Sequence, residues 1–187
     1  MSFDVIDHLA GLAPDGPLAA IRNVRRQARE QAQASYAALF EASELADMSL
    51  EERHAVATFV AALHRDTTIS AFYAKALPDD LAITVATEAT RGMASGPFGA
   101  YPAGPLSAED TTGPVYTASP GVAPRLAAAL NHAHMLVFHL RDSSPAHLQA
   151  LLDAGWSTTG IVTLSQLVAF LSFQIRVVHG LRTLAGA

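Results

Sequence analysis

The chain has 187 residues, half of them hydrophobic and 16% charged, with a formal net charge of −5. This length predicts one domain, 1–187, that buries about 70% of the surface of its unfolded chain, and the low charge content excludes broad disorder. The acidic balance lacks the basic face that nucleic acid or an anionic membrane requires, so neither is expected as a partner.

The chain contains no cysteine. Disulfides, thiolate metal sites and a cysteine nucleophile of its own are therefore excluded. The first residues, Met-Ser-Phe-Asp-Val-Ile-Asp-His, lack the basic start and apolar run of a secretory signal, so we expect a cytoplasmic protein. The most apolar stretch, Ile161 to Leu184, is long enough to span a bilayer but includes Gln174, Arg176 and Arg182, and we predict a buried helix there.

Residues 17–43 have apolar side chains recurring at spacings of three and four, which predicts an amphipathic helix. Its other face holds Arg22, Arg25, Arg26 and Arg29. These arginines are either an ordinary solvated or interface-pairing face or a site that attracts an anion or an acidic partner.

The pattern Ser49-x-x-Glu52 is a capping box that predicts the start of a helix running to about Asp66. A second helix is expected over 69–77. Pro78 and the two aspartates after it suit the first turn of a third helix that reaches Arg91, which completes the N-terminal helices of 1–94.

Residues 95–122 are rich in proline and glycine and cannot continue a helix. A loop this long inside a compact domain is usually functional or disordered. Because it also contains large apolar side chains, such as Phe98, Leu106 and Tyr116, we expect an ordered lid or an arm that wraps a neighbouring subunit.

The C-terminal helices of 123–187 are predicted over 123–140 and 145–154, followed by a long helix capped by Ser157. The long helix has two apolar stripes, so it should be buried on two sides. Residues 49–69 match residues 157–177 at an offset of 108, for example Ser49 with Ser157 and Val60 with Val168. This agreement reflects either an internal duplication or shared apolar periodicity.

Residues 49–77 resemble the redox helix pair of the alkylhydroperoxidase-D-like and carboxymuconolactone-decarboxylase-like superfamily. Both open with serine and acidic residues and run through an apolar Val-Ala-Ala-Leu stretch. Residues 154–181 and 99–110 look like a cysteine-poor branch of that superfamily. The resemblance implies an all-α helical bundle that assembles as a homo-oligomer, from dimer to hexamer.

In that superfamily a glutamate precedes a Cys-x-x-Cys motif by twelve residues, and a histidine follows it by four. The corresponding positions here hold His54, Asp66, Ile69 and Tyr73. Aspartate and isoleucine cannot supply peroxidatic thiol chemistry. The resemblance is thus to peroxidase-related oxidoreductases, with thiol peroxidase activity expected to be lost.

The titratable residues near the matching position are His54, His64, Asp66 and Tyr73, which we take as catalytic candidates. Histidine transfers protons near neutral pH, and a carboxylate can orient its ring. We therefore expect a small-molecule pocket with non-redox acid–base chemistry. The alternatives are scattered polar residues at helix ends and, for the whole protein, a non-enzymatic partner of a cysteine-containing homologue.

A second group of pocket candidates consists of Gln174, Arg176 and His179, with Gln174 at the repeat position of Asp66. A buried arginine there would need one of the chain's own acids, a neighbouring subunit or an anionic ligand. His132 and His139 are seven residues apart, whereas helical metal ligands more often sit three or four apart. We expect His132 to line a polar pocket or a subunit contact, with no metal, and no nucleotide or other cofactor motif is present.

Overall fold

The computed structural model describes residues 3–13, 16–42 and 47–186, and over these ranges the protein is all-α. The helices are α1 (Val5–Ala10), α2 (Pro17–Val24), α3 (Arg26–Phe40), α4 (Leu50–Leu63), α5 (Thr67–Ala74), α6 (Asp79–Arg91), α7 (Pro124–Phe138), α8 (Pro145–Asp153) and α9 (Thr158–Ala185). Two 3₁₀ turns, η1 (Pro105–Glu109) and η2 (Leu140–Asp142), complete the described elements.

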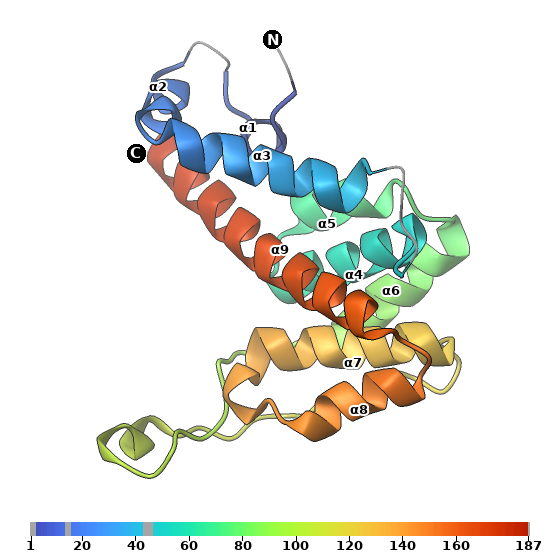
Figure 1. Cartoon of the computed structure of the whole chain (residues 1–187). Coiled ribbons are helices and arrows are strands. Elements are labelled where there is room, and N and C mark those ends of the chain that lie inside the picture. Colours follow the sequence, from blue (N-terminus) through green and yellow to red (C-terminus); the bar gives the residue numbers. More distant parts are fainter. Residues whose placement is uncertain (1–2, 14–15, 43–46, 187) are drawn as a thin grey trace.

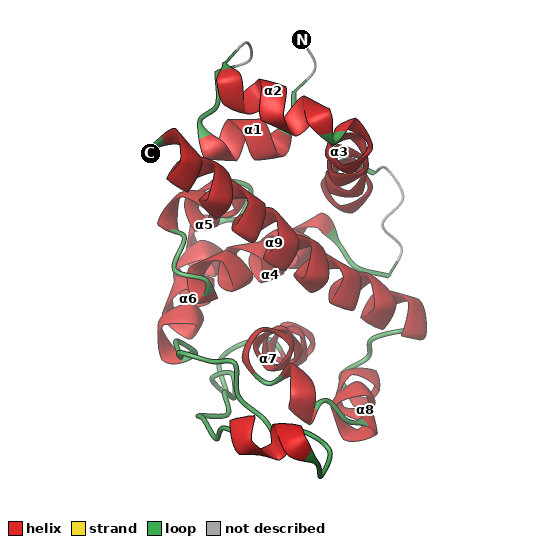
Figure 2. Cartoon of the chain, turned by 90° about the vertical axis from the view of Figure 1, so that its left-hand side faces the viewer, coloured by secondary structure: helices red, strands yellow, loops and turns green. Residues whose placement is uncertain are grey.

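The helices form three groups along the molecule. In Figure 1, α1 to α3 lie at one end, α4 to α6 in the middle, and α7 and α8 at the other end. Helix α9 runs obliquely across all three groups, and Figure 2 shows it crossing α4. It contacts α1, α2, α3, α4, α7 and α8, so the last helix joins the others into one body.

Helix α4 forms the centre of the core. Every residue from Ala55 to Ala61 is buried, and α4 contacts α3, α5, α6, α7 and α9. A helix that is apolar around its whole circumference must be covered on all sides. Its start is the predicted capping box, because Ser49 Oγ accepts from Glu52 N and the Glu52 carboxylate accepts from Ser49 N.

Helix α9 is buried along its predicted main stripe, which consists of Ile161, Leu164, Val168, Leu171, Ile175 and Val178. The second stripe is only partly covered, since Leu167 and Leu181 are buried but Leu184 is exposed. By length and composition α9 could also cross a membrane, although half of its most apolar window is buried inside this structure. Core helices pass the same test, so this is weak evidence for a membrane location.

The single helix predicted over 17–43 is wrong. The chain breaks at Arg25, whose φ of −114° and ψ of 58° are not helical, and α3 ends at Phe40; residue 43 itself lies outside the described ranges. Ile21 and Val24, expected on the buried face, are 53% and 84% exposed. Because of this break, α2 does not continue the apolar stripe of α3. Its Arg22 instead reaches Asp4 and Asp7 at the start of α1.

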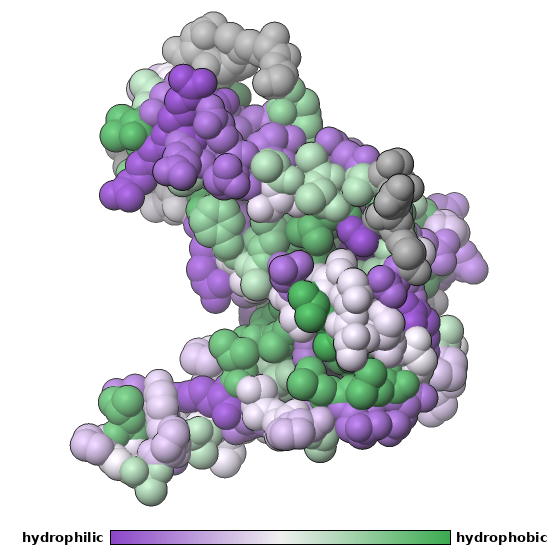
Figure 3. Space-filling model, in the orientation of Figure 1, coloured by the Kyte–Doolittle hydropathy of each residue, from purple (hydrophilic) through white to green (hydrophobic). Residues whose placement is uncertain are grey.

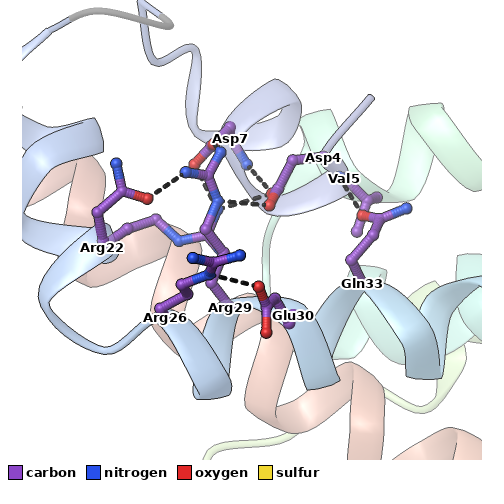
Figure 4. A network of polar contacts seen from close by, with 9 residues as sticks. Asp4, Val5, Asp7, Arg22, Arg26, Arg29, Glu30 and Gln33 are labelled. Atoms are coloured by element: carbon purple, nitrogen blue, oxygen red, sulfur yellow. Dashed lines mark hydrogen bonds and ion pairs between the residues drawn. The ribbon is translucent and has the colours of Figure 1, made fainter. Parts of the chain in front are cut away.

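Three arginines of α2 and α3, namely Arg22, Arg26 and Arg29, form ion pairs with acids of the same chain (Figure 4). Arg22 and Arg29 each bond both Asp4, the N-cap of α1, and Asp7 within α1, with Arg22 Nη1 2.7 Å from Asp4 Oδ1. The Arg22 side chain is only 7% exposed, so this cluster holds the short α1 in place. Arg26 pairs with Glu30 in solvent, where an ion pair adds little.

Residues 97–113, here called the arm, project from the body beside α7 and α8 (Figure 1). Gly99 and Thr111 form a β-bridge near its base. Phe98 at the base is partly buried, whereas Leu106 at the tip is 53% exposed. The tip does not close over the chain's own helices, and its expected contact with a neighbouring subunit stays a prediction.

Candidate functional site

Asp66 connects three parts of the fold. It caps α5, where its Oδ1 accepts from Ile69 N at 2.8 Å. Its Oδ2 accepts from His179 Nε2 at 2.8 Å and from Arg182 Nη1 at 2.6 Å, both on α9. Arg182 also donates to the carbonyl of Leu9 in α1. The Asp66 side chain is 2% exposed and its hydrogen-bonding capacity is largely used.

Burial by itself would raise the pKa of Asp66, but the bonds from Ile69 N–H and His179 and the charge of Arg182 hold it below its ordinary value. The carboxylate thus stays ionised at neutral pH. His179 is half-exposed, and its other ring nitrogen, Nδ1, takes no part in this bond. That nitrogen could exchange a proton with solvent.

His64 ends α4 and lies beside the same part of α9. Its Nε2 is 3.5 Å from Ser172 Oγ, and Arg176 donates to the Ser172 carbonyl. Burial, with the nearby charges of Arg176 and His179, lowers the pKa of His64 to about 4. His64 is therefore neutral at pH 7.

Tyr73 and Gln174 are completely buried and bond each other, Tyr73 Oη donating to Gln174 Oε1 at 2.7 Å. Burial raises the pKa of Tyr73 far above its ordinary value. His54 packs against the rings of Phe40 and Tyr73, and burial lowers its pKa. Gln174 Nε2 and His54 Nδ1 are enclosed without a hydrogen-bond partner in the described structure. These three residues belong to the core.

The structure thus brings together the two groups that the sequence analysis treated separately. Asp66 meets His179, Tyr73 meets Gln174, and His64 lies near Arg176, while His132 belongs to another region. Sequence reasoning missed Arg182, although its position three residues after His179 places it on the same helix face.

The other region is a pocket of about 400 Å³ between α7, α8 and residues 115–116. Much of its wall is small and apolar, including Ala127, Ala128, Met135 and Ala150. Four histidines also line it, namely His132, His134, His139 and His147. A mainly apolar hollow with a few polar groups is the usual composition of a small-molecule site.

His132 links the pocket wall to α9. It is 5% exposed, and its Nε2 is 3.0 Å from Ser165 Oγ. Its Nδ1 is buried without a partner in the described residues. Burial, followed by the charge of His147, lowers the pKa of His132 to about 4, so the ring is neutral at pH 7.

His139 bonds the backbone at Pro114, directly before the pocket-lining residues Val115 and Tyr116. Its Nδ1 is 2.9 Å from Asp142 Oδ2 and its Nε2 is 3.0 Å from the Pro114 carbonyl. Both partners are acceptors, so both bonds form together only when the ring carries two protons. The bond from His139 keeps the pKa of Asp142 below its ordinary value.

Glu88 of α6 bonds the same segment of the chain through Tyr116 and Ser119. It is 2% exposed and accepts from Tyr116 Oη at 2.5 Å, from Ser119 N at 3.1 Å and from Ser119 Oγ, with Arg91 pairing at its outer edge. Burial would raise the pKa of Glu88, but the bonds from Ser119 and Tyr116 bring it below its ordinary value. Sequence reasoning did not identify Glu88, because a single acid in an amphipathic helix gives no such signal.

A second hollow of about 390 Å³ adjoins the pocket on the side of the arm. Val115, His139 and Asp142 line both, so the base of the arm shapes the pocket entrance. No group of three His, Asp or Glu side chains in the described ranges is placed to hold a metal ion. In comparisons with known proteins, no family model, curated protein or solved structure matches this chain.

Proposed function

We propose that this protein binds a small molecule in the pocket between α7 and α8 and performs no thiol redox chemistry of its own. The observation that carries the proposal is the pocket itself, about 400 Å³ in size, with an apolar floor and four imidazoles in its wall. A neutral imidazole such as that of His132 can take part in proton transfer in a partly desolvated site, so the pocket supports non-redox acid–base chemistry.

The pocket is a better candidate than the group around Asp66. There, the carboxylate is already bonded by three donors, and Tyr73 and Gln174 enclose each other. Such contacts join α1, α5 and α9 and leave the open nitrogen of His179 as the accessible group. The first-choice acid–base residues thus serve mainly to hold α9, and His132 becomes the predicted residue that adjoins a ligand.

The proposal is tested by screening a fragment library with ligand-observed NMR against three proteins. Wild type should give hits, Ala128→Leu should lose them because the larger side chain fills the pocket floor, and Ala86→Leu on exposed α6 should retain them. An absence of hits, or hits that persist unchanged in Ala128→Leu, would refute the proposal.

The arm supports a second candidate, a non-enzymatic partner of a cysteine-containing homologue or of further copies of this chain. In Figure 3 the arm stands away from the body and leaves a hollowed flank above it. Leu106 at its tip is exposed and could pack against an apolar surface of another chain.

This candidate is tested by light scattering after size-exclusion chromatography, with the chain alone and mixed with a Cys-x-x-Cys homologue. A mixed complex that Leu106→Glu dissociates would support it. A monomer under both conditions would exclude the arm as an assembly element.

A further inference from the structure

We propose that the pocket between α7 and α8 selects an uncharged molecule with an apolar body and a carbonyl-type oxygen, to which Asn131 and His147 donate hydrogen bonds. This inference rests on the proposed function, because it specifies the chemistry of a ligand at the same site.

The charges of the wall favour an uncharged ligand. Among its lining residues in the described structure there is no lysine or arginine, so an anion would find no permanent cation. The one lining carboxylate, Asp142, is engaged by His139 and by Ala100 N. A cationic ligand would have to compete with His139 for it. Both ion types would lose hydration without a free partner.

Asn131 is oriented so that it can donate to a ligand. Its Oδ1 accepts from Ala118 N at 2.8 Å, which settles which end of the amide is oxygen. The two N–H groups of Nδ2 are therefore available, and Asn131 itself is half-buried in the wall.

His147 is a second donor for the same type of reason. Its Nδ1 accepts from Ser144 N at 3.1 Å, so in the neutral ring the proton must be on Nε2. His134 donates from Nε2 to the Gly92 carbonyl and His139 donates to Pro114 and Asp142, which commits their protons within the protein. His132 Nε2 is engaged by Ser165, and its unpartnered Nδ1 is buried, so the accessible protons left for a ligand belong to Asn131 and His147, and they match an oxygen acceptor.

The remaining wall sets the body of the ligand. Ala127 and Ala128 of α7 supply a small apolar surface and Met135 a larger, flexible one, and 400 Å³ is at the lower end of ordinary ligand sites. A compound with one ring or a short branched chain fits that volume.

The inference is tested with four matched probes against the whole chain by ligand-observed NMR: acetophenone, ethylbenzene, benzoate and benzylammonium. Acetophenone should bind roughly tenfold more tightly than each of the others, because only it combines the apolar ring with an uncharged acceptor. Asn131→Asp keeps the acceptor for Ala118 N but removes both donors, and should abolish this preference. Asn23→Asp, on the exposed face of α2, should leave it unchanged.

The outcomes separate this inference from the proposed function. If ethylbenzene binds as tightly as acetophenone, the pocket is a binding site but the donors do not select its ligand. If benzoate or benzylammonium binds best, the expected neutrality of the ligand is wrong. If wild type binds no probe and the fragment screen is also empty, the proposed function fails with it. The probe series on wild type decides these points even if the Asn131 variant does not fold.

Discussion

Replacing Glu88 by glutamine should destabilise the protein by about 2 kcal/mol at pH 7. Glutamine keeps one oxygen for Tyr116, Ser119 N and the shorter Arg91 contact, but its amide nitrogen cannot accept from Ser119 Oγ, and the charge that strengthens all these bonds is lost. Hydrogen bonds to a buried charged group contribute about 1.5–3 kcal/mol, and part of this is retained. For a chain of this length the loss corresponds to a decrease of about 4–8 °C in Tm.

The pH dependence provides the sharper test. The folded-state pKa of Glu88 lies below its ordinary value of 4.5, so its contribution to stability is present above that value and is lost as the pH falls through the folded pKa. Urea unfolding of wild type and Glu88→Gln should therefore give free energies that converge in acid. Glu109→Gln on the exposed arm is the control and should match wild type. A gap below about 0.5 kcal/mol at pH 7, or a gap that stays constant in acid, would refute the role assigned to Glu88.

Three further predictions concern the other buried polar groups. Asp66→Asn should cost about 2 kcal/mol in urea unfolding, and Asp66→Ala about 1 kcal/mol more, because asparagine still caps α5; equal losses would contradict the capping contribution. Tyr73→Phe and Gln174→Met should each destabilise the fold by about 1–3 kcal/mol, yet the double variant should lose clearly less than their sum, because it leaves neither polar group unpaired. Additive losses in that double-mutant cycle would mean that the bond contributes nothing. His132→Gln should reduce stability most near pH 7 and less toward pH 4, because the wild-type ring has a lowered pKa and its neutral form loses its advantage as the pH falls below 6.5; a pH-independent difference in thermal unfolding would argue against the buried neutral ring.

The all-α architecture and most helix positions follow from local signals in the sequence. Ser49 with Glu52 and Ser157 mark the starts of α4 and α9, and the apolar stripe from Ile161 to Val178 predicts the buried face of α9. These signals work because capping and periodicity depend on neighbours within one or two turns.

The break at Arg25 could not be predicted in this way. The local pattern favours one helix across 17–40, whereas the structure interrupts it at Arg25 and lets Arg22 and Arg29 share the carboxylates of Asp4 and Asp7. Those acids lie at the start of α1, a short helix that no sequence pattern here predicts. A contact between elements decides the outcome here, and local propensity is outweighed.

The candidate site was predictable in part. The family resemblance pointed to Asp66 and Tyr73, the offset of 108 residues pointed to Gln174, and the structure does place Asp66 and Tyr73 against α9. The α7–α8 pocket was signalled only by the histidines at 132 and 139, because its other side comes from residues 115–116 and α8, and their approach depends on the whole chain. The family resemblance and the oligomeric state stay predictions.

The position of α9 has a consequence for the order in which the protein can fold during synthesis. Contacts of α9 reach back to α1, and Arg182 bonds the carbonyl of Leu9 across 173 residues. Until residues 158–185 leave the ribosome, the surfaces of α4 and α7 that contact α9 stay uncovered. Cotranslational folding should therefore stop at a partly collapsed intermediate with exposed apolar surface, and chaperone dependence is expected to be strongest just before α9 emerges.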